Sequence, residues 1–231
     1  MLKPKKKLNR ASKKEIKEDK FVLTVLDLYD KLKEYYVHIL TGIAILAVII
    51  FLTNYFSQNL QERSSRANVA LDQAINLLAE GNENQGALAL QNLIEEYSDT
   101  KAAYYARIKL GTFYYNNNDL ENATRYFKQA VDGDIGIPLI EAKALCGYGD
   151  CLFKAGQYQE SANQYKKAAE IVKDKELKQA YQLNAALAYI YSGDRNQAYE
   201  FVKKVELDKF PSMITEKKLE AIKKALEAAS I

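Results

Sequence analysis

Histidine and cysteine are scarce in this 231-residue sequence, which contains one His and two Cys. The only histidine, His38, lies in an apolar stretch, so it cannot complete a Ser/His/Asp set with residues of the remaining chain. Glycine-rich phosphate-binding loops and clusters of metal-ligating side chains are also missing from the sequence. We therefore expect neither an enzyme nor a protein that holds a cofactor, a metal ion or a small-molecule substrate.

The two cysteines, Cys146 and Cys151, are predicted to lie on one helix. Helix geometry separates α-carbons five residues apart by roughly 8–9 Å, which is too far for a disulfide. The sequence has no CxxC pair, which argues against a zinc site. Both cysteines are expected to be small buried side chains.

A strong net charge is lacking as well, since the formal net charge is only +3. Residues 1–36 contain eleven Lys or Arg and six Asp or Glu and carry +5, which leaves −2 for the remainder. A nearly neutral domain is a poor partner for nucleic acid, because phosphate contacts need clustered cations. The basic excess adjoins an apolar stretch, so a membrane is its expected partner.

That apolar stretch covers residues 37–56 and contains no charged side chain. Twenty helical residues span about 30 Å, the thickness of a hydrocarbon core. The segment that precedes it is too long for a signal peptide, and no small-x-small cleavage site follows. We predict an uncleaved transmembrane helix.

Its orientation follows from the flanking cations. Eleven precede the span, whereas residues 57–76 contain only Arg63 and Arg66. The sequence therefore predicts a single-pass membrane protein with a cytoplasmic N-terminus and an extracytoplasmic C-terminal domain. In a bacterium with two membranes this is a protein of the bacterial inner membrane whose C-terminal domain lies in the periplasm.

Before the span, residues 15–36 show helical periodicity of apolar side chains, at Phe21, Val25, Leu28 and Leu32. This pattern fits a helix that lies on the inner leaflet. The competing interpretation is a helix that pairs with a cytosolic or membrane partner. Both interpretations stay open at this point.

The rest of the sequence contains an internal repeat. Residues 103–131, 141–172 and 176–205 align with one another, and residues 67–97 form a weaker copy. Each copy has two apolar-periodic helices joined at a turn residue, and the intervals between successive turns are 37, 38 and 37 residues. The turn residues are Gly81, Asn118, Gly156 and Gly193. One such hairpin cannot bury its apolar face alone, so stacked hairpins are expected.

The resulting prediction is an all-α protein with one transmembrane helix, a solenoid of about four helical hairpins and a C-terminal capping helix that begins at Ser212 as N-cap. The predicted segments are a basic cytoplasmic tail over residues 1–36, the span over 37–56, a linker or start of the first repeat helix over 57–66, repeats over 67–99, 103–137, 141–174 and 176–210, and the capping helix over 211–231.

The repeats resemble the tetratricopeptide repeat. The second unit matches the family pattern at Leu110, Gly111, Tyr114, Ala123, Phe127 and Ala130; the third matches at Gly149, Gly156, Tyr158, Tyr165 and Ala168; the fourth matches at Tyr189, Gly193 and Ala198. Small residues such as Gly111 and Gly149 would let helices approach closely, and aromatic rings such as Phe127 and Tyr165 would fill the gaps between them.

The resemblance also implies a ligand groove lined by the first helix of each hairpin. The implied groove residues are Tyr105, Ile108, Thr112, Tyr115, Asn116, Lys143, Cys146, Asp150, Phe153, Lys154, Ala180, Leu183, Leu187, Ile190 and Tyr191. The set is apolar and aromatic, which favours apolar or aromatic segments of other proteins as partners. The alternative is that packing between repeats buries several of these side chains.

The layout as a whole, from basic tail and single span to divergent repeats and final helix, resembles the YfgM-like family. Members are ancillary subunits of the SecYEG translocon and are associated with periplasmic chaperone networks. The resemblance implies a membrane-anchored scaffold that meets polypeptides emerging from the translocon. The alternative is a scaffold for envelope assembly or cell division with the same topology.

Overall fold

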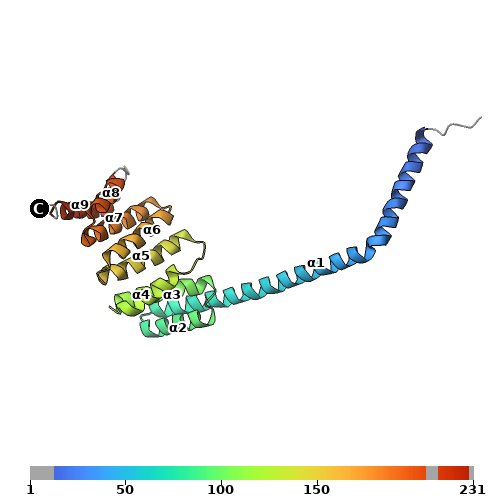
Figure 1. Ribbon diagram of the computed structural model, residues 1–231. Helices are drawn as coiled ribbons and strands as arrows, with labels where there is room; N and C mark the ends of the chain where they lie inside the picture. Colours follow the sequence, from blue (N-terminus) through green and yellow to red (C-terminus); the bar gives the residue numbers. More distant parts are fainter. Residues whose placement is uncertain (1–12, 207–212, 229–231) are drawn as a thin grey trace, which may run out of the picture. The chain divides into compact units, whose positions relative to one another are not determined.

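The computed structural model describes residues 13–206 and 213–228, which fold as helices α1 to α9 without a strand in those ranges (Figure 1). The predicted all-α class is confirmed. The chain divides into two compact units, Met1–Leu60 and Gln61–Ile231, which are described separately. Residues 1–12 of the predicted basic tail and the predicted cap Ser212 lie outside the described residues.

The first unit consists of the N-terminal part of α1 (Lys13–Ala79). Apolar side chains of this part, such as Phe21, Ile43 and Phe51, are more than half exposed. The stretch Lys33–Ala79 contains a segment that is long and apolar enough to cross a membrane, and none of that segment is buried. Helix α1 continues without a break through residues 57–66 into the second unit.

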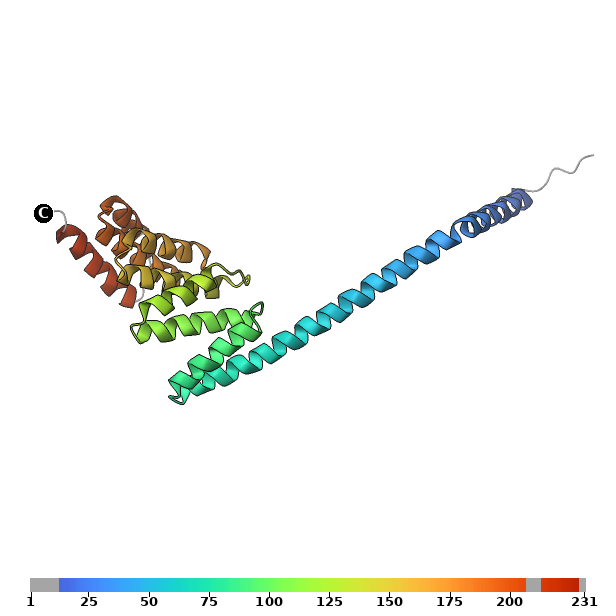
Figure 2. The same cartoon turned by 60° about the horizontal axis from the view of Figure 1, so that its bottom comes forward.

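The second unit is a solenoid of helical hairpins with the tetratricopeptide-like arrangement (Figure 2). Its hairpins are residues 61–79 of α1 with α2 (Glu83–Glu96), α3 (Lys101–Asn116) with α4 (Leu120–Val131), α5 (Pro138–Lys154) with α6 (Tyr158–Ile171), and α7 (Lys175–Ser192) with α8 (Arg195–Glu206). The final helix is α9 (Met213–Ala228). From α2 onward each helix packs on the next, and α3 also packs on α5 and α7 on α9.

All four predicted turn residues have a left-handed backbone, with φ of 84° at Gly81, 60° at Asn118, 77° at Gly156 and 84° at Gly193. Glycine adopts this conformation without steric cost, and asparagine tolerates it better than most residues. In each turn, the backbone amide of the residue that follows the turn residue donates to the carbonyl five residues earlier at 2.9 Å, as from Asp119 to Tyr114. The first helix of every hairpin therefore ends in the same way.

Ring-on-glycine packing holds neighbouring helices together. A Cβ on Gly111 of α3 would lie 2.9 Å from the Phe127 ring, and a Cβ on Gly149 would lie 2.9 Å from the Tyr165 ring. The predicted close approaches at Gly111 and Gly149 are therefore confirmed. Gly147 of α5 also faces Phe127 too closely for a Cβ, so this one ring of α4 is seated between glycines of two successive hairpins.

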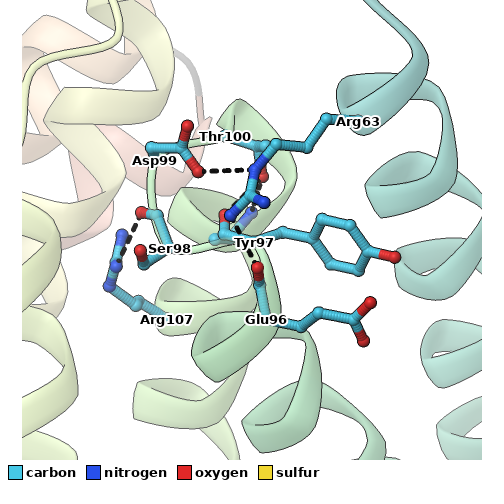
Figure 3. Close-up of polar contacts among 8 residues, drawn as sticks. Arg63, Glu96, Tyr97, Ser98, Asp99, Thr100 and Arg107 are labelled. Carbon is cyan, nitrogen blue, oxygen red and sulfur yellow. Dashed lines mark hydrogen bonds and ion pairs between the residues drawn. The ribbon is translucent and has the colours of Figure 1, made fainter. Parts of the chain in front are cut away.

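Arg63 fastens residues 61–79 of α1 to the turn that follows α2 (Figure 3). Its Nε lies 3.1 Å from Oδ1 of Asp99, and one terminal nitrogen donates to the Glu96 carbonyl at 2.7 Å. Its guanidinium also lies 5.5 Å from the centre of the Tyr97 ring. A cation bound to the last carbonyls of a helix is favourable, because these groups have no partner within the helix. Thr100 then caps α3 by accepting from the Ala103 amide at 3.2 Å.

Helix α9 closes the solenoid. Leu219, Ile222 and Leu226 are buried in the cluster formed with α7 and α8. Charged side chains such as Lys217 and Glu220 occupy its exposed face. One apolar and one charged face suit a helix that ends a repeat array.

Candidate binding groove

A groove of about 600 Å³ lies mainly between α3 and α5, the first helices of two successive hairpins. We call it the α3–α5 groove. It is lined by Tyr105, Ile108, Lys109, Thr112, Tyr115, Asn116, Phe127, Ile140, Lys143, Cys146, Gly147, Asp150 and Tyr181. Eight of these residues belong to the set that the sequence singled out: Tyr105, Ile108, Thr112, Tyr115, Asn116, Lys143, Cys146 and Asp150.

The lining is graded from buried to exposed. Phe127 and Tyr181 are 4% and 6% exposed and form the buried part of the lining. Side chains such as Tyr105 and Tyr115 are half-buried, and Lys143 is exposed. Apolar walls with a few polar groups are typical of sites that bind other molecules. The groove residues expected on α3 are thus available for contact.

Phe153, Lys154 and Tyr191 do not line this groove. Lys154 lies with its Nζ 3.9 Å from the centre of the Tyr115 ring, which joins two hairpins by a cation–π contact. Phe153 and Tyr191 pack edge-on, with ring centres 5.1 Å apart, and both contact Tyr158. Tyr191 remains 58% exposed, so these aromatic rings form a second surface near the turns.

The residues of α7 that were expected to line the groove lie outside it, unlike those of α3. Leu183 is fully buried, which removes it from any binding surface. Leu187 and Ile190 are half-buried and pack against the core cluster of α7, α8 and α9. Ala180 is half-buried and does not line the groove, so α7 contributes Tyr181 instead.

A chain of polar contacts crosses four helices beside the groove. The Tyr165 hydroxyl of α6 donates to Oδ1 of Asp150 at 2.6 Å, and Oδ2 of Asp150 lies 4.0 Å from the sulfur of Cys146. Asn184 of α7 approaches this sulfur at 3.9 Å with Nδ2, and Lys218 of α9 donates to Oδ1 of Asn184. We call these five residues the inter-helix polar network.

Burial shifts the ionisation of this network. It raises the pKa of the Asp150 carboxyl, against the opposing effects of the Tyr165 hydrogen bond and of Lys218 and Lys154. It raises the pKa of the Cys146 thiol to about 12, and the charge of Asp150 acts in the same direction. It lowers the pKa of Lys218. A thiol with a raised pKa stays protonated at neutral pH, so Cys146 is expected to be a poor nucleophile there.

Asn184 and Lys218 were not among the residues predicted from the sequence to line the groove. Asn184 directly follows Leu183, which was expected to face the groove. Shifting the expected groove positions on α7 by one residue would have included Asn184. Lys218 looks like one of several solvated charges in a Lys- and Glu-rich helix. No pattern in the sequence distinguishes it from its neighbours.

Within residues 20–31, 33–206 and 215–228, whose side chains the structure describes, no group of three or more His, Cys, Asp or Glu is arranged to hold a metal ion. What the groove offers is an extended contact surface with aromatic walls. A solenoid of helical hairpins with such a groove is a tetratricopeptide-type scaffold for interactions between proteins.

Comparison with known proteins supports this class. A family model described as the tetratricopeptide repeat-like domain matches residues 32–135. The chain aligns with the structure of MamA from AMB-1 at a TM-score of 0.51 and 20% identity, over 64% of this chain and 75% of MamA. It aligns with PilF of Pseudomonas aeruginosa at a TM-score of 0.53 and 16% identity, over 72% and 74% of the two chains. At these identities the likeness concerns the fold. No curated protein sequence matches the chain significantly.

Proposed function

We propose that this protein is a membrane-anchored scaffold whose α3–α5 groove binds apolar or aromatic segments of other proteins outside the cytoplasm. The observation that carries the proposal is the groove itself, in which half-buried apolar and aromatic side chains of two hairpins, Tyr105 and Tyr115 of α3 and Ile140 of α5, line a space of about 600 Å³. Aromatic side chains that keep part of their surface accessible supply large contact area with few rotatable bonds, so they make efficient contacts with other polypeptides.

Support for the anchor comes from the apolar segment of α1, which is long enough to cross a bilayer. Support for the orientation comes from the eleven Lys and Arg that precede this segment. Of the two cations that follow it closely, Arg63 already serves the fold by binding Asp99 and the Glu96 carbonyl. The domain would then lie on the periplasmic side of the bacterial inner membrane.

The partner we propose is a polypeptide emerging from the SecYEG translocon, or the translocon itself. This choice rests on the layout of basic tail, single span, divergent repeats and capping helix, which resembles the YfgM-like family. The alternative, a scaffold for envelope assembly or cell division, shares the anchor and the groove and differs only in the partner.

Site-specific photo-cross-linking in intact cells tests the proposal. A photoreactive residue at Thr112, which is exposed in the groove, should cross-link to secreted polypeptides or to the translocon channel. The same residue at Lys166, which is exposed on α6 away from the groove, is the matched control. Equal cross-linking from both positions would contradict a groove-based function, and recovery of division or envelope proteins from Thr112 alone would favour the alternative.

A further inference from the structure

We propose that a small acidic pocket beside the loop between α4 and α5 binds an arginine side chain of a partner polypeptide. The pocket has a volume of about 260 Å³ and is lined by residues of this loop and of α3, α4, α5 and α6. We call it the loop pocket. It shares no lining residue with the α3–α5 groove, so it is a second contact site that does not depend on the function proposed above.

The Tyr104 side chain of α3 lines the loop pocket and carries an unpaired hydroxyl. Tyr104 is only 2% exposed, and its Oη has no hydrogen-bond partner within the described part of the chain. A buried hydroxyl that lacks a partner has lost its water without a replacement, which costs free energy. A ligand that donates a hydrogen bond to Tyr104 would recover this loss.

The charges of the lining define the kind of donor. Asp134 of the loop, Glu141 of α5 and Glu170 of α6 are carboxylates, and Lys167 of α6 is the cation among them. Where the structure describes side chains, none of these four residues forms an ion pair of 4.0 Å or less. Three negative charges against one positive charge leave a net charge of −2 in the pocket, which favours a cationic donor.

Two of the carboxylates are held in place by the loop backbone. Oε1 of Glu141 accepts from the amides of Ile135 at 3.3 Å and Ile137 at 3.2 Å. Oδ1 of Asp134 accepts from the Gly136 amide at 2.9 Å. Among the described residues, the other oxygen of each carboxylate accepts no hydrogen bond. These two oxygens are therefore positioned in advance and available to a donor.

The same two carboxylates act on the Tyr104 hydroxyl. Burial raises the pKa of Tyr104 to about 12, the charges of Glu141 and Asp134 act in the same direction, and Arg107 opposes them. The hydroxyl is therefore protonated and neutral at pH 7. Arg107 does not fill the pocket, since it is not among the lining residues and one of its terminal nitrogens donates to the Ser98 carbonyl at 3.0 Å (Figure 3).

The size and the apolar part of the pocket favour a long cationic side chain. A volume of about 260 Å³ is below the range of roughly 300–1,000 Å³ that is typical of sites for whole small molecules. Val131, Leu145 and Ile171 also line the pocket and can contact an aliphatic stem. A guanidinium has five N–H donors in a planar fork and is less strongly hydrated than an ammonium. It can therefore reach acceptors on α3, the loop and α5 together.

A metal ion fits this set of side chains less well. Among the side chains that the structure describes, three or more His, Cys, Asp or Glu are nowhere arranged to hold a metal ion. One oxygen of Glu141 and one of Asp134 already accept from backbone amides. Lys167 would also repel a divalent cation.

The test measures binding of small probes to the full chain in nanodiscs of zwitterionic lipid, by saturation-transfer NMR with empty nanodiscs as the blank. The probes are the Nα-acetyl methylamides of arginine, lysine and citrulline. Citrulline has the shape of arginine without its charge. The arginine probe should bind most tightly, the lysine probe more weakly and the citrulline probe weakest.

Matched variants separate the pocket from the fold. Tyr104→Phe removes only the unpaired hydroxyl, so it should unfold at the same or a higher urea concentration than the original chain. It should weaken the arginine probe by roughly tenfold. Glu170→Gln on the exposed surface of α6 should weaken this probe by about threefold at low salt. Glu160→Gln, exposed in the first turn of α6, is the control and should leave binding unchanged.

Each of the other outcomes overturns the proposal. Equal binding of the arginine and citrulline probes would show that charge is not recognised, and equal binding of the arginine and lysine probes would remove the preference for a guanidinium. Unchanged binding to Tyr104→Phe, or a lower urea midpoint of this variant, would show that the hydroxyl serves the fold instead. Displacement of the arginine probe by equimolar ethanolamine would indicate a lipid headgroup as the ligand, and displacement by equimolar Mg²⁺ would indicate a metal ion.

Discussion

The Tyr165 hydroxyl on α6 donates a hydrogen bond of 2.6 Å to the carboxylate of Asp150 on α5. Tyr165 is buried and Asp150 is half-buried. Within this hairpin, each side chain therefore has the other as its hydrogen-bond partner in place of water. The other oxygen of Asp150 faces the Cys146 thiol, a weak donor. The carboxylate therefore depends on Tyr165 for its one strong hydrogen bond within the described part of the chain.

Replacing Tyr165 by Phe should destabilise the domain by about 1.5–3 kcal/mol, because it leaves a half-buried charge without its donor. Asp150→Asn is the matched change, since its side-chain oxygen still accepts from Tyr165 and the buried charge is gone. We expect it to be mildly stabilising at neutral pH, where the original chain holds a partly buried charge at this position. Urea denaturation of the full chain in detergent, followed by circular dichroism, measures both. Equal stability of Tyr165→Phe and the original chain would contradict this account.

The raised pKa of Asp150 predicts a pH dependence with a defined sign. Burial lifts the pKa above the ordinary value of 3.8, so the folded state holds this proton more tightly than the unfolded state does. The favourable contribution is complete below about pH 3.8 and is lost as the pH rises through the raised pKa. The stability of Asp150→Asn relative to the original chain should therefore increase between about pH 3.5 and about pH 7. A constant or falling difference would show that burial does not govern this carboxyl.

Gly147→Ala should destabilise the domain by about 1–3 kcal/mol, because its Cβ would overlap the Phe127 ring. Phe127→Leu shortens the side chain and makes room for that Cβ. The double variant should therefore cost less than the two single changes added together, which is the signature of direct contact. Additive costs in the same denaturation measurement would place the strain elsewhere.

Arg63→Ala should cost about 1–2 kcal/mol, since it removes an ion pair and the hydrogen bond to the last turn of α2. Hydrogen exchange should become faster at the amides of residues 97–103, which follow that turn. Arg66→Ala is the control, because Arg66 forms its ion pair with Glu62, four residues earlier on the exposed surface of α1. It should leave stability and exchange unchanged. Equal effects of the two changes would refute the role of Arg63.

The proposed topology predicts the activity of a reporter enzyme that works only outside the cytoplasm. Fused after Ile231, it should be active. Fused after Tyr36, before the apolar segment, it should be inactive. The reverse pattern would place the domain in the cytoplasm and exclude a periplasmic partner.

The repeat architecture was predictable because it depends on local signals that recur. Gly81, Asn118, Gly156 and Gly193 mark helix ends whose geometry few other residues tolerate, and all four have the left-handed backbone. The seating of Phe127 on Gly111 follows from the same spacing. These are short-range requirements, so the sequence alone reveals them.

Contacts between segments that are far apart in the chain could not be predicted from the sequence. Arg63 and Asp99 are 36 residues apart, and nothing in their local surroundings indicates that they meet. Lys218, which is 34 residues from its partner Asn184, was missed for the same reason. Of the residues that the resemblance implies for the groove, those on α3 and three of those on α5 line it, whereas those on α7 do not. Leu183 is instead buried in the core cluster that includes Leu219, Ile222 and Leu226 of α9, and Leu187 and Ile190 pack against that cluster.

Phe127 lies on α4, in the hairpin of α3 and α4, but its ring packs against Gly111 of that hairpin and against Gly147 of the next one. Cutting the chain in the loop of residues 132–137 would leave one side of this ring bare to water. The two hairpins are therefore expected to melt as a single cooperative block, and neither would serve as a minimal fragment for biochemical work.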